Sequence, residues 1–259
     1  MNLRYITVDV GSINLNYEYI FKLANLSNKV EIAIPVSSFF LRSNQKWFDW
    51  IEGLLNISAN IENSPNISLY LEKDSCSAFC IGSINSDLSR WFSLKNKKTG
   101  NFVIKRCQIN YCFSIKNDKN NEKARNIYPE KIARNIRNKP GQEFIFTYDS
   151  ENIRREIIAE LNQIGAKFSV MSSCYNGFLN KTDWKAPLAD YPQGYLNSFN
   201  PENIKTSLDE LSLIIPDHTI WIGMNRAFNN PKTKESHFIN VENTIKKALE
   251  WIEKSRTRS

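Results

Sequence analysis

Residues that bind soft metals or carry redox chemistry are few in this sequence. Its 259 residues include five cysteines and only two histidines, His218 and His237, and no two cysteines stand in a CxxC spacing. A structural zinc site needs about four such ligands at close spacing, so the sequence predicts no metal and no cofactor. The odd number of cysteines favours reduced, mostly buried thiols over a full set of disulfides.

Long apolar runs are also absent. No segment approaches the roughly 18 apolar residues that a membrane-spanning helix needs. The first ten residues, MNLRYITVDV, lack the apolar stretch and the small-residue cleavage site of a secretory signal. Because 41% of the residues are hydrophobic, the composition is still that of a globular protein. We therefore expect a cytoplasmic protein without a membrane partner.

Glycine is scarce as well, and the turn after the first apolar segment, DVGSIN, contains only one. An open doubly wound sheet normally carries a glycine-rich turn at this point, so this alternative fold is less favoured. The chain does contain short segments rich in Ile, Val, Phe and Tyr, which alternate only weakly. Strands buried on both faces of a parallel sheet have this pattern. The segments span 4–10, 29–36, 66–72, 102–109, 143–149, 167–173, 194–199 and 219–224.

Helical segments separate these strands. Three of them have a clear apolar face, at 45–61, 150–164 and 241–254. Weaker helical patterns span 16–26, 84–94, 129–138 and 201–213, and 174–193 reads mostly as loop. Eight strands, each followed by a helix or its equivalent, predict an α/β fold, a single (β/α)8 TIM barrel. No Gly/Ser-rich linker divides the chain, so we expect one domain over residues 1–259.

Positive charge is concentrated in one part of the chain. Residues 95–139 contain 13 Lys and Arg against three acidic residues, whereas the net charge of the whole chain is +7. Such a region can attract nucleic acid or another polyanion. However, its most charged stretch, SIKNDKNNEKARN, has no aromatic residue to stack on bases. A solvated loop and helix is therefore the simpler interpretation.

Four stretches in the second half of the chain carry a family resemblance. They are KRCQINY, FIFTYDSENI, TDWKAPLADYPQGYLNSFNPENI and TIWIGMNRAFNNPKTKESHFINVENTIKKALEWI. In order and spacing they resemble phosphoribosylanthranilate isomerase and unassigned barrels close to it, and NPEN and Gln108 are the most specific points. The resemblance implies an enzyme of tryptophan biosynthesis that rearranges an aminosugar phosphate. A general base and a general acid would move the proton, and the substrate phosphate would bind after the seventh strand.

The chain departs from that family at each position where the resemblance implies a function. Val10 stands at the position of the cysteine base, and Ser172 at that of the aspartate acid. Asn197 and Ser198 replace two glycines that would let backbone amides approach the phosphate, and Gly223 replaces an aspartate. A serine hydroxyl does not act alone as a general acid near neutral pH. No family catalytic residue is therefore retained with its chemistry intact.

Polar residues nevertheless follow the carboxyl ends of the predicted strands, where the active sites of barrel enzymes lie. The candidate catalytic acid–base residues are Asp9, Glu72 and Asp149. Asp149 can equally cap the next helix, and Asp9 can equally bind backbone N–H groups of the first loop. The candidate substrate-binding residues, for a small anionic or phosphorylated ligand, are Gln108, Asn110, Ser172, Asn197, Ser198, Asn225 and Arg226.

Three functions stay open at this point. The first is an isomerase-like enzyme with altered catalytic groups, acting on a small phosphorylated or anionic substrate. The second is a catalytically inactive barrel used for binding or assembly. The third is a polyanion or nucleic-acid binder that uses the basic region 95–139. The fold alone does not choose among them.

Overall fold

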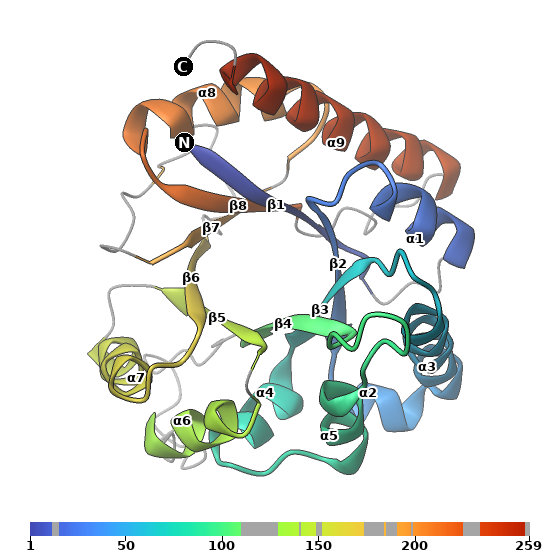
Figure 1. Ribbon diagram of the computed structural model, residues 1–259, viewed down its shortest axis with the longest axis vertical. Helices are drawn as coiled ribbons and strands as arrows, with labels where there is room; N and C mark the ends of the chain where they lie inside the picture. The colour runs from blue at the N-terminus through green and yellow to red at the C-terminus, as the bar shows by residue number, and fades with distance from the viewer. Residues whose placement is uncertain are drawn as a thin grey trace. The chain divides into compact units, whose positions relative to one another are not determined.

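The computed structural model describes residues 1–11, 16–109, 129–139, 141–148, 152–173, 184, 191–197, 199–224 and 234–256. Its eight strands form a closed parallel barrel in which each strand neighbours the next in the chain and the last neighbours the first (Figure 1). The predicted (β/α)8 barrel is therefore confirmed, and the open doubly wound sheet is excluded.

The sequence predicts every strand and most of the helices. The strands are β1 (Asn2–Asp9), β2 (Val30–Val36), β3 (Asn66–Leu71), β4 (Ile104–Ile109), β5 (Glu143–Tyr148), β6 (Phe168–Ser173), β7 (Gln193–Asn197) and β8 (Thr219–Met224). The helices are α1 (Tyr17–Ala24), α2 (Ser38–Ser43), α3 (Gln45–Asn60), α4 (Lys73–Cys80), α5 (Ser86–Ser93), α6 (Pro129–Arg137), α7 (Asn152–Gln163), α8 (Ile204–Ile214) and α9 (Lys234–Arg256). Of these, α2 and α4 are not predicted. None of the helices within the described ranges is long and apolar enough to cross a membrane.

The chain forms two compact units. Unit 1 comprises Met1–Ile34, Pro65–Ile67 and Ser169–Ser259, and unit 2 comprises Pro35–Ser64 and Ser68–Phe168. In unit 1, β1 pairs with both β2 and β8, and β7 pairs with β8 and β6, all in parallel. In Figure 1, α8 and α9 lie side by side along this part of the sheet. Unit 1 therefore joins the first strand of the chain to the last three.

The inner face of the sheet in unit 1 is packed by large side chains that lie over glycines. A Cβ atom on Gly194 of β7 would overlap the buried indole of Trp221 on β8. A Cβ atom on Gly223 of β8 would likewise overlap the Leu196 side chain of β7. Each of the two strands thus has one glycine that makes room for a large side chain of the other strand. Gly223, which stands where the resemblance implies an aspartate, is required here for packing.

Unit 2 has an aromatic core between its sheet and its helices. Phe144 of β5 packs against Phe79 of α4 and Phe92 of α5, with ring centroids 5.6 and 6.4 Å apart. The Gln142 side chain, which is buried just before β5, donates to the backbone carbonyls of Phe92 and Ile104 at 2.9 and 3.0 Å. These bonds satisfy buried carbonyls at the start of the sheet and tie α5 to β4.

Asparagine begins several helices. Asn16, Asn44 and Asn85 each accept a hydrogen bond from a backbone N–H in the first turn of α1, α3 and α5, at 2.8–3.1 Å. These bonds satisfy amides that have no partner inside the helix. The many asparagines of this chain therefore have a structural role that the basic, Asn-rich composition alone does not reveal.

Candidate functional site

The first candidate acid–base residue, Asp9, ends β1. Thr7, two residues earlier, pairs with Glu31 of β2, and its hydroxyl donates to that buried carboxylate at 2.8 Å. Thr7 also pairs with Gly223, so it lies on the inner face. Because side chains alternate along a strand, Asp9 lies on the inner face as well. Its Oδ1 accepts a 2.8 Å hydrogen bond from the N–H of Gly11, which adopts a φ of 62° that glycine takes without penalty.

The second candidate, Glu72, lies between β3 and α4 in unit 2. Its N–H donates to the Val36 carbonyl at 2.9 Å, which places it beside the end of β2. It occupies the cap position of α4, but its side chain does not cap that helix. Close by, the Ser37 hydroxyl donates to Oδ1 of Asp74 at 2.7 Å. Two carboxylates and a hydroxyl therefore follow the neighbouring strands β2 and β3.

Gln108 lies on the inner face of β4. It pairs with Ile145 of β5. The residue that precedes Ile145 is Phe144, and its side chain points outward to α4 and α5. Alternation therefore turns Ile145 and its partner Gln108 inward. Since β4 neighbours β3, the Gln108 amide and Glu72 come from adjacent strands of unit 2. Gln108 is also buried, which suits a fixed hydrogen-bonding group.

Asn197 ends β7 on the side of the sheet that faces the helices. Tyr195 packs against Trp184, whose indole N–H donates to Glu210 of α8 at 2.8 Å, so Tyr195 points outward. Leu196 points inward over Gly223, and alternation returns Asn197 to the outer side. Ser172 of β6 pairs in register with Tyr195. The structure therefore does not bring Asn197 together with Asp9 on the inner face.

The Asn-Pro-Glu-Asn turn leads into α8, and three of its own amides are already bonded. The Asn200 side chain accepts from the N–H groups of Glu202 and Asn203 at 3.0 and 2.9 Å. In return, the Asn203 side chain accepts from the N–H of Asn200 at 2.9 Å. The helix itself begins at Ile204. A phosphate that approached this turn would have to displace these bonds, because the turn supplies its own acceptors.

Five predicted site residues lie outside the described residues. These are Asp149, Asn110, Ser198, Asn225 and Arg226. Their assignments as acid–base or substrate-binding groups stay predictions. Among the residues that the structure does describe, no three His, Cys, Asp or Glu side chains form a group that could hold a metal ion.

Charged residues inside the sheet are the feature that the sequence reasoning missed. In unit 2, the Arg106 and Glu143 side chains form a buried ion pair at 3.5 Å, from paired positions of β4 and β5. In unit 1, Glu31 is 1% exposed and binds Thr7. Glu31 interrupts an otherwise apolar strand, and a charge in such a position is seldom buried without a partner. That interruption could have identified Glu31, whereas Arg106 follows Lys105 and Glu143 begins its strand.

One buried thiol is in an environment that keeps it inert. Cys107 of β4 is fully buried, and burial raises its pKa, although the nearby Lys139 acts in the opposite direction. Burial in turn lowers the pKa of Lys139. Cys76 and Cys80 are also buried and unbridged. Since the thiolate is the reactive form, Cys107 is not a nucleophile at neutral pH.

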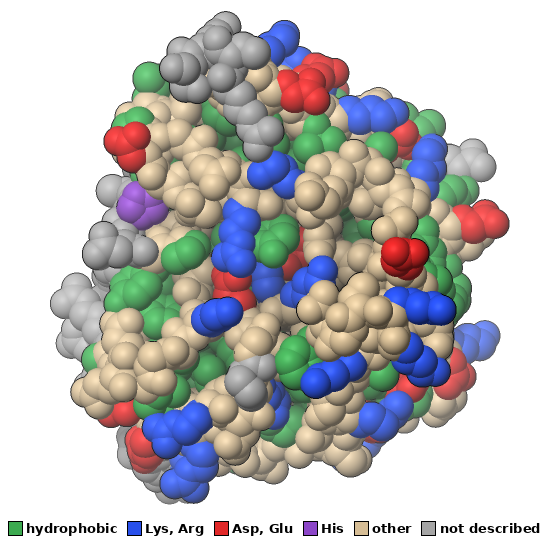
Figure 2. Space-filling view, viewed as in Figure 1, with side chains coloured by type: hydrophobic (Ala, Val, Ile, Leu, Met, Phe, Trp, Pro, Cys, Tyr) green, Lys and Arg blue, Asp and Glu red, His purple; other side chains and the backbone are tan. Residues whose placement is uncertain are grey.

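Several cations of the basic region make internal contacts. Arg106 is buried against Glu143, the Lys95 ammonium lies 5.2 Å from the centre of the Phe102 ring, and that of Lys139 lies 5.5 Å from the Phe92 ring. On the face drawn in Figure 2, Lys and Arg side chains are dispersed among acidic, apolar and uncharged ones. The charge of residues 95–139 is thus partly used within unit 2.

Comparisons with known proteins assign neither a family nor an activity to this chain. No protein-family model matches the chain, and no curated protein matches it. Among solved structures it is similar to the tryptophan synthase subunit alpha from Campylobacter jejuni, at 11% identity and a TM-score of 0.38, over 94% of this chain and 95% of that one. At this identity no residue role or activity passes from that protein to this chain.

Proposed function

We propose that this barrel is an isomerase-like enzyme that acts on a small phosphorylated or otherwise anionic substrate. The observation that supports it is the arrangement in unit 2, where Glu72 follows β3 and the inward-facing Gln108 lies on the adjacent β4. A carboxylate and a fixed amide at the carboxyl ends of adjacent strands are the groups that proton transfer at a sugar carbon needs. The resemblance of the second half to phosphoribosylanthranilate isomerase favours the same class.

In the proposed reaction, Glu72 takes the proton from the carbon next to a carbonyl or imine carbon. The electron pair of that C–H bond forms a double bond between the two carbons, and the carbonyl oxygen or imine nitrogen receives a proton. The proton on Glu72 then returns to the former carbonyl or imine carbon, while the hydroxyl on the first carbon loses its proton to the group that protonated the oxygen or nitrogen and becomes the new carbonyl. The isomerisation therefore needs no external oxidant or reductant. Gln108 donates a hydrogen bond to the substrate. Asp9, at the end of β1, is the second acid–base candidate and is tested by its own variant.

The assay is rearrangement of an aminosugar phosphate by the purified chain, in parallel with Glu72→Gln and Asp9→Asn. Loss of a general acid or base lowers kcat by about a hundredfold or more. Glu62→Gln is the matched control, because Glu62 is exposed in the loop that precedes β3, and it should leave kcat within about twofold. Equal activity in Glu72→Gln and the parent protein would contradict the role of Glu72.

A catalytically inactive binding barrel is the second candidate, and the start of α8 favours it. The side chains of Asn200 and Asn203 accept from the amides that would otherwise hold a phosphate. This candidate predicts no turnover by the parent protein and little rise in its melting temperature with phosphorylated sugars, because those amides do not receive a phosphate. Pathway assignment to tryptophan biosynthesis depends on the first candidate, because only turnover identifies the substrate.

A further inference from the structure

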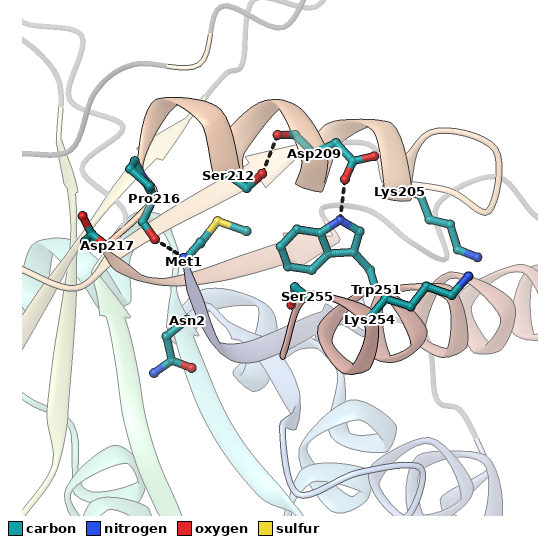
Figure 3. Close-up of a pocket in the computed structure, with 10 residues that line it drawn as sticks. All are labelled: Met1, Asn2, Lys205, Asp209, Ser212, Pro216, Asp217, Trp251, Lys254 and Ser255. Carbon is teal, nitrogen blue, oxygen red and sulfur yellow. Dashed lines mark hydrogen bonds between the residues drawn. The ribbon is translucent and has the colours of Figure 1, made fainter. Parts of the chain in front are cut away.

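A pocket of about 650 Å³ lies on the outside of unit 1. It is formed by α8, the C-terminal half of α9, the loop before β8 and the start of β1 (Figure 3). Its volume is within the range of small-molecule sites, which is about 300–1,000 Å³. Asn2 lines the pocket at the first residue of β1, whereas Asp9 ends the same strand. Eight residues of strand span about 23 Å or more, so this pocket is separate from the strand ends discussed above.

An indole ring forms one wall of the pocket and is held in place. The Trp251 indole N–H donates to Oδ1 of Asp209 across the two helices at 2.7 Å. In Figure 3 the ring lies beneath Asp209, with Met1 on one side of it and Lys205 and Lys254 extending past it on the other. Because its N–H is already bonded, the indole offers its flat apolar surface to a ligand. A planar aromatic ring is the group that stacks best on such a surface.

Lysines outnumber carboxylates at the side of the pocket toward which Lys205 extends. The Lys205 ammonium binds the Glu250 carboxylate at 2.7 Å, and that bond lowers the pKa of Glu250, with smaller contributions from Lys254 and Lys247. On this side Lys205 and Lys254 both lie near Glu250, while the two carboxylates that line the pocket, Asp209 and Asp217, lie above the indole and beyond Met1 (Figure 3). The side chains of Lys205 and Glu250 are 41% and 54% exposed, so this pair is weak and an anionic ligand can compete for Lys205. Because the indole N–H already binds Asp209, the two lysines favour a negatively charged group at their own side of the ring, away from Asp217.

We infer that this pocket, defined by Asp209, Trp251, Lys205 and Lys254, is a second ligand site for a planar aromatic molecule that carries an anionic group. The aromatic ring stacks on Trp251, and the anionic group binds Lys254 and Lys205. A nucleoside monophosphate has this chemistry. The site is independent of the proposed enzymatic function, since it lies at the other end of β1 and shares no residue with Glu72, Gln108 or Asp9.

Isothermal titration of the full chain with adenosine 5′-monophosphate tests this site. We expect saturable binding of one equivalent that weakens as the salt concentration rises. Trp251→Leu should abolish it, and Lys254→Gln should raise Kd by roughly fivefold. Lys246→Gln is the matched control, because Lys246 lies on the same helix but binds Glu242, and it should leave Kd unchanged. Thermal melting of each variant establishes that it is folded.

Adenosine and inorganic phosphate, titrated separately, distinguish the two parts of the ligand, and both should bind at least about tenfold more weakly than the monophosphate. Equal binding of adenosine would overturn the role of the anionic group, and equal binding of phosphate would overturn that of the ring. An unchanged Kd in Lys254→Gln, or no binding up to about 5 mM, would overturn the site itself.

Discussion

Two glycines of neighbouring strands determine how the inner face of unit 1 packs. Since a Cβ on Gly194 would overlap the Trp221 indole, we predict that Gly194→Ala lowers the free energy of unfolding by about 3 kcal/mol. Urea denaturation of the variant and the parent measures this loss. Replacing Trp221 by Leu in the same chain should recover part of it, because the smaller side chain leaves room for the methyl group.

Gly100 supplies the control for that substitution. It adopts a φ of 71° and has open space where a Cβ would stand. Gly100→Ala therefore costs only the strain of the left-handed conformation, about 1 kcal/mol. If the two alanine variants lose equal stability, overlap with Trp221 is not what makes Gly194 necessary.

One carboxylate of α9 makes stability depend on pH. Glu242 binds Lys246 at 2.6 Å and Lys22 of α1 at 2.9 Å, and these two bonds, that of Lys246 first, hold its pKa below the ordinary value of 4.5. A lowered pKa in the folded state gives stability that is present above the unfolded pKa and is lost as pH falls through the folded one. We predict that Glu242→Gln costs about 1 kcal/mol at neutral pH.

The difference between Glu242→Gln and the parent should shrink toward zero as the pH falls below about 4. Urea denaturation over a pH series measures it. Glu253→Gln, on the same helix, is the control and should change stability little at any pH. A stability difference at Glu242 that stays constant into acid would show that charge is not its cause.

The turn that leads into α8 is held by one asparagine, although no side chain caps the helix itself. Asn200 accepts from two backbone N–H groups of the turn that leads into the helix. We predict that Asn200→Ala lowers the free energy of unfolding by about 1 kcal/mol, because both amides lose their acceptor. Asn200→Gly should cost less, since glycine is itself tolerated in turns. Thermal or urea unfolding gives both values, and equal stability of all three proteins would contradict the role of Asn200 in holding the turn.

The order of strands and helices could be predicted from the sequence because it depends on the local pattern of apolar and polar residues. Apolar runs bounded by polar residues marked all eight strands, and apolar faces marked α3 and α9. The short α2 and α4 were missed. Each begins within two residues of a strand end, and α2 is only six residues long, so neither shows a repeated apolar face. The helix predicted from residue 201 begins at Ile204, because the side chain bonds of Asn200 and Asn203 hold a turn there.

The candidate site was less accessible than the fold. Residues could be assigned to strand ends, but the side on which each lies depends on register, which the sequence does not state. Asn197 and Gln108 were treated alike, whereas register places one outward and the other inward. The inward charges of Glu31 and Arg106 were not singled out, because their partners are residues of other strands.

At the scale of the whole barrel, charges enclosed by the sheet matter most. Glu143→Gln removes the carboxylate that the buried Arg106 guanidinium faces, and we predict a loss of about 3 kcal/mol in the free energy of unfolding. The double variant Arg106→Met/Glu143→Leu should recover much of it, because no charge then remains buried at this pair. Urea denaturation tests both, and a single variant as stable as the parent would rule out a strong ion pair.

The pairing of β1 with β8 has a consequence for the order of events during synthesis. The first strand leaves the ribosome early, but its neighbour on one side lies more than 200 residues further along the chain. Until that neighbour emerges, the edge of β1 presents unpaired amides to the cell, where chaperones or another chain can bind them. Most of unit 2 is contiguous in the chain, so its strands do not depend on a partner that is synthesised much later. Synthesis of β8 is therefore the step that closes the ring.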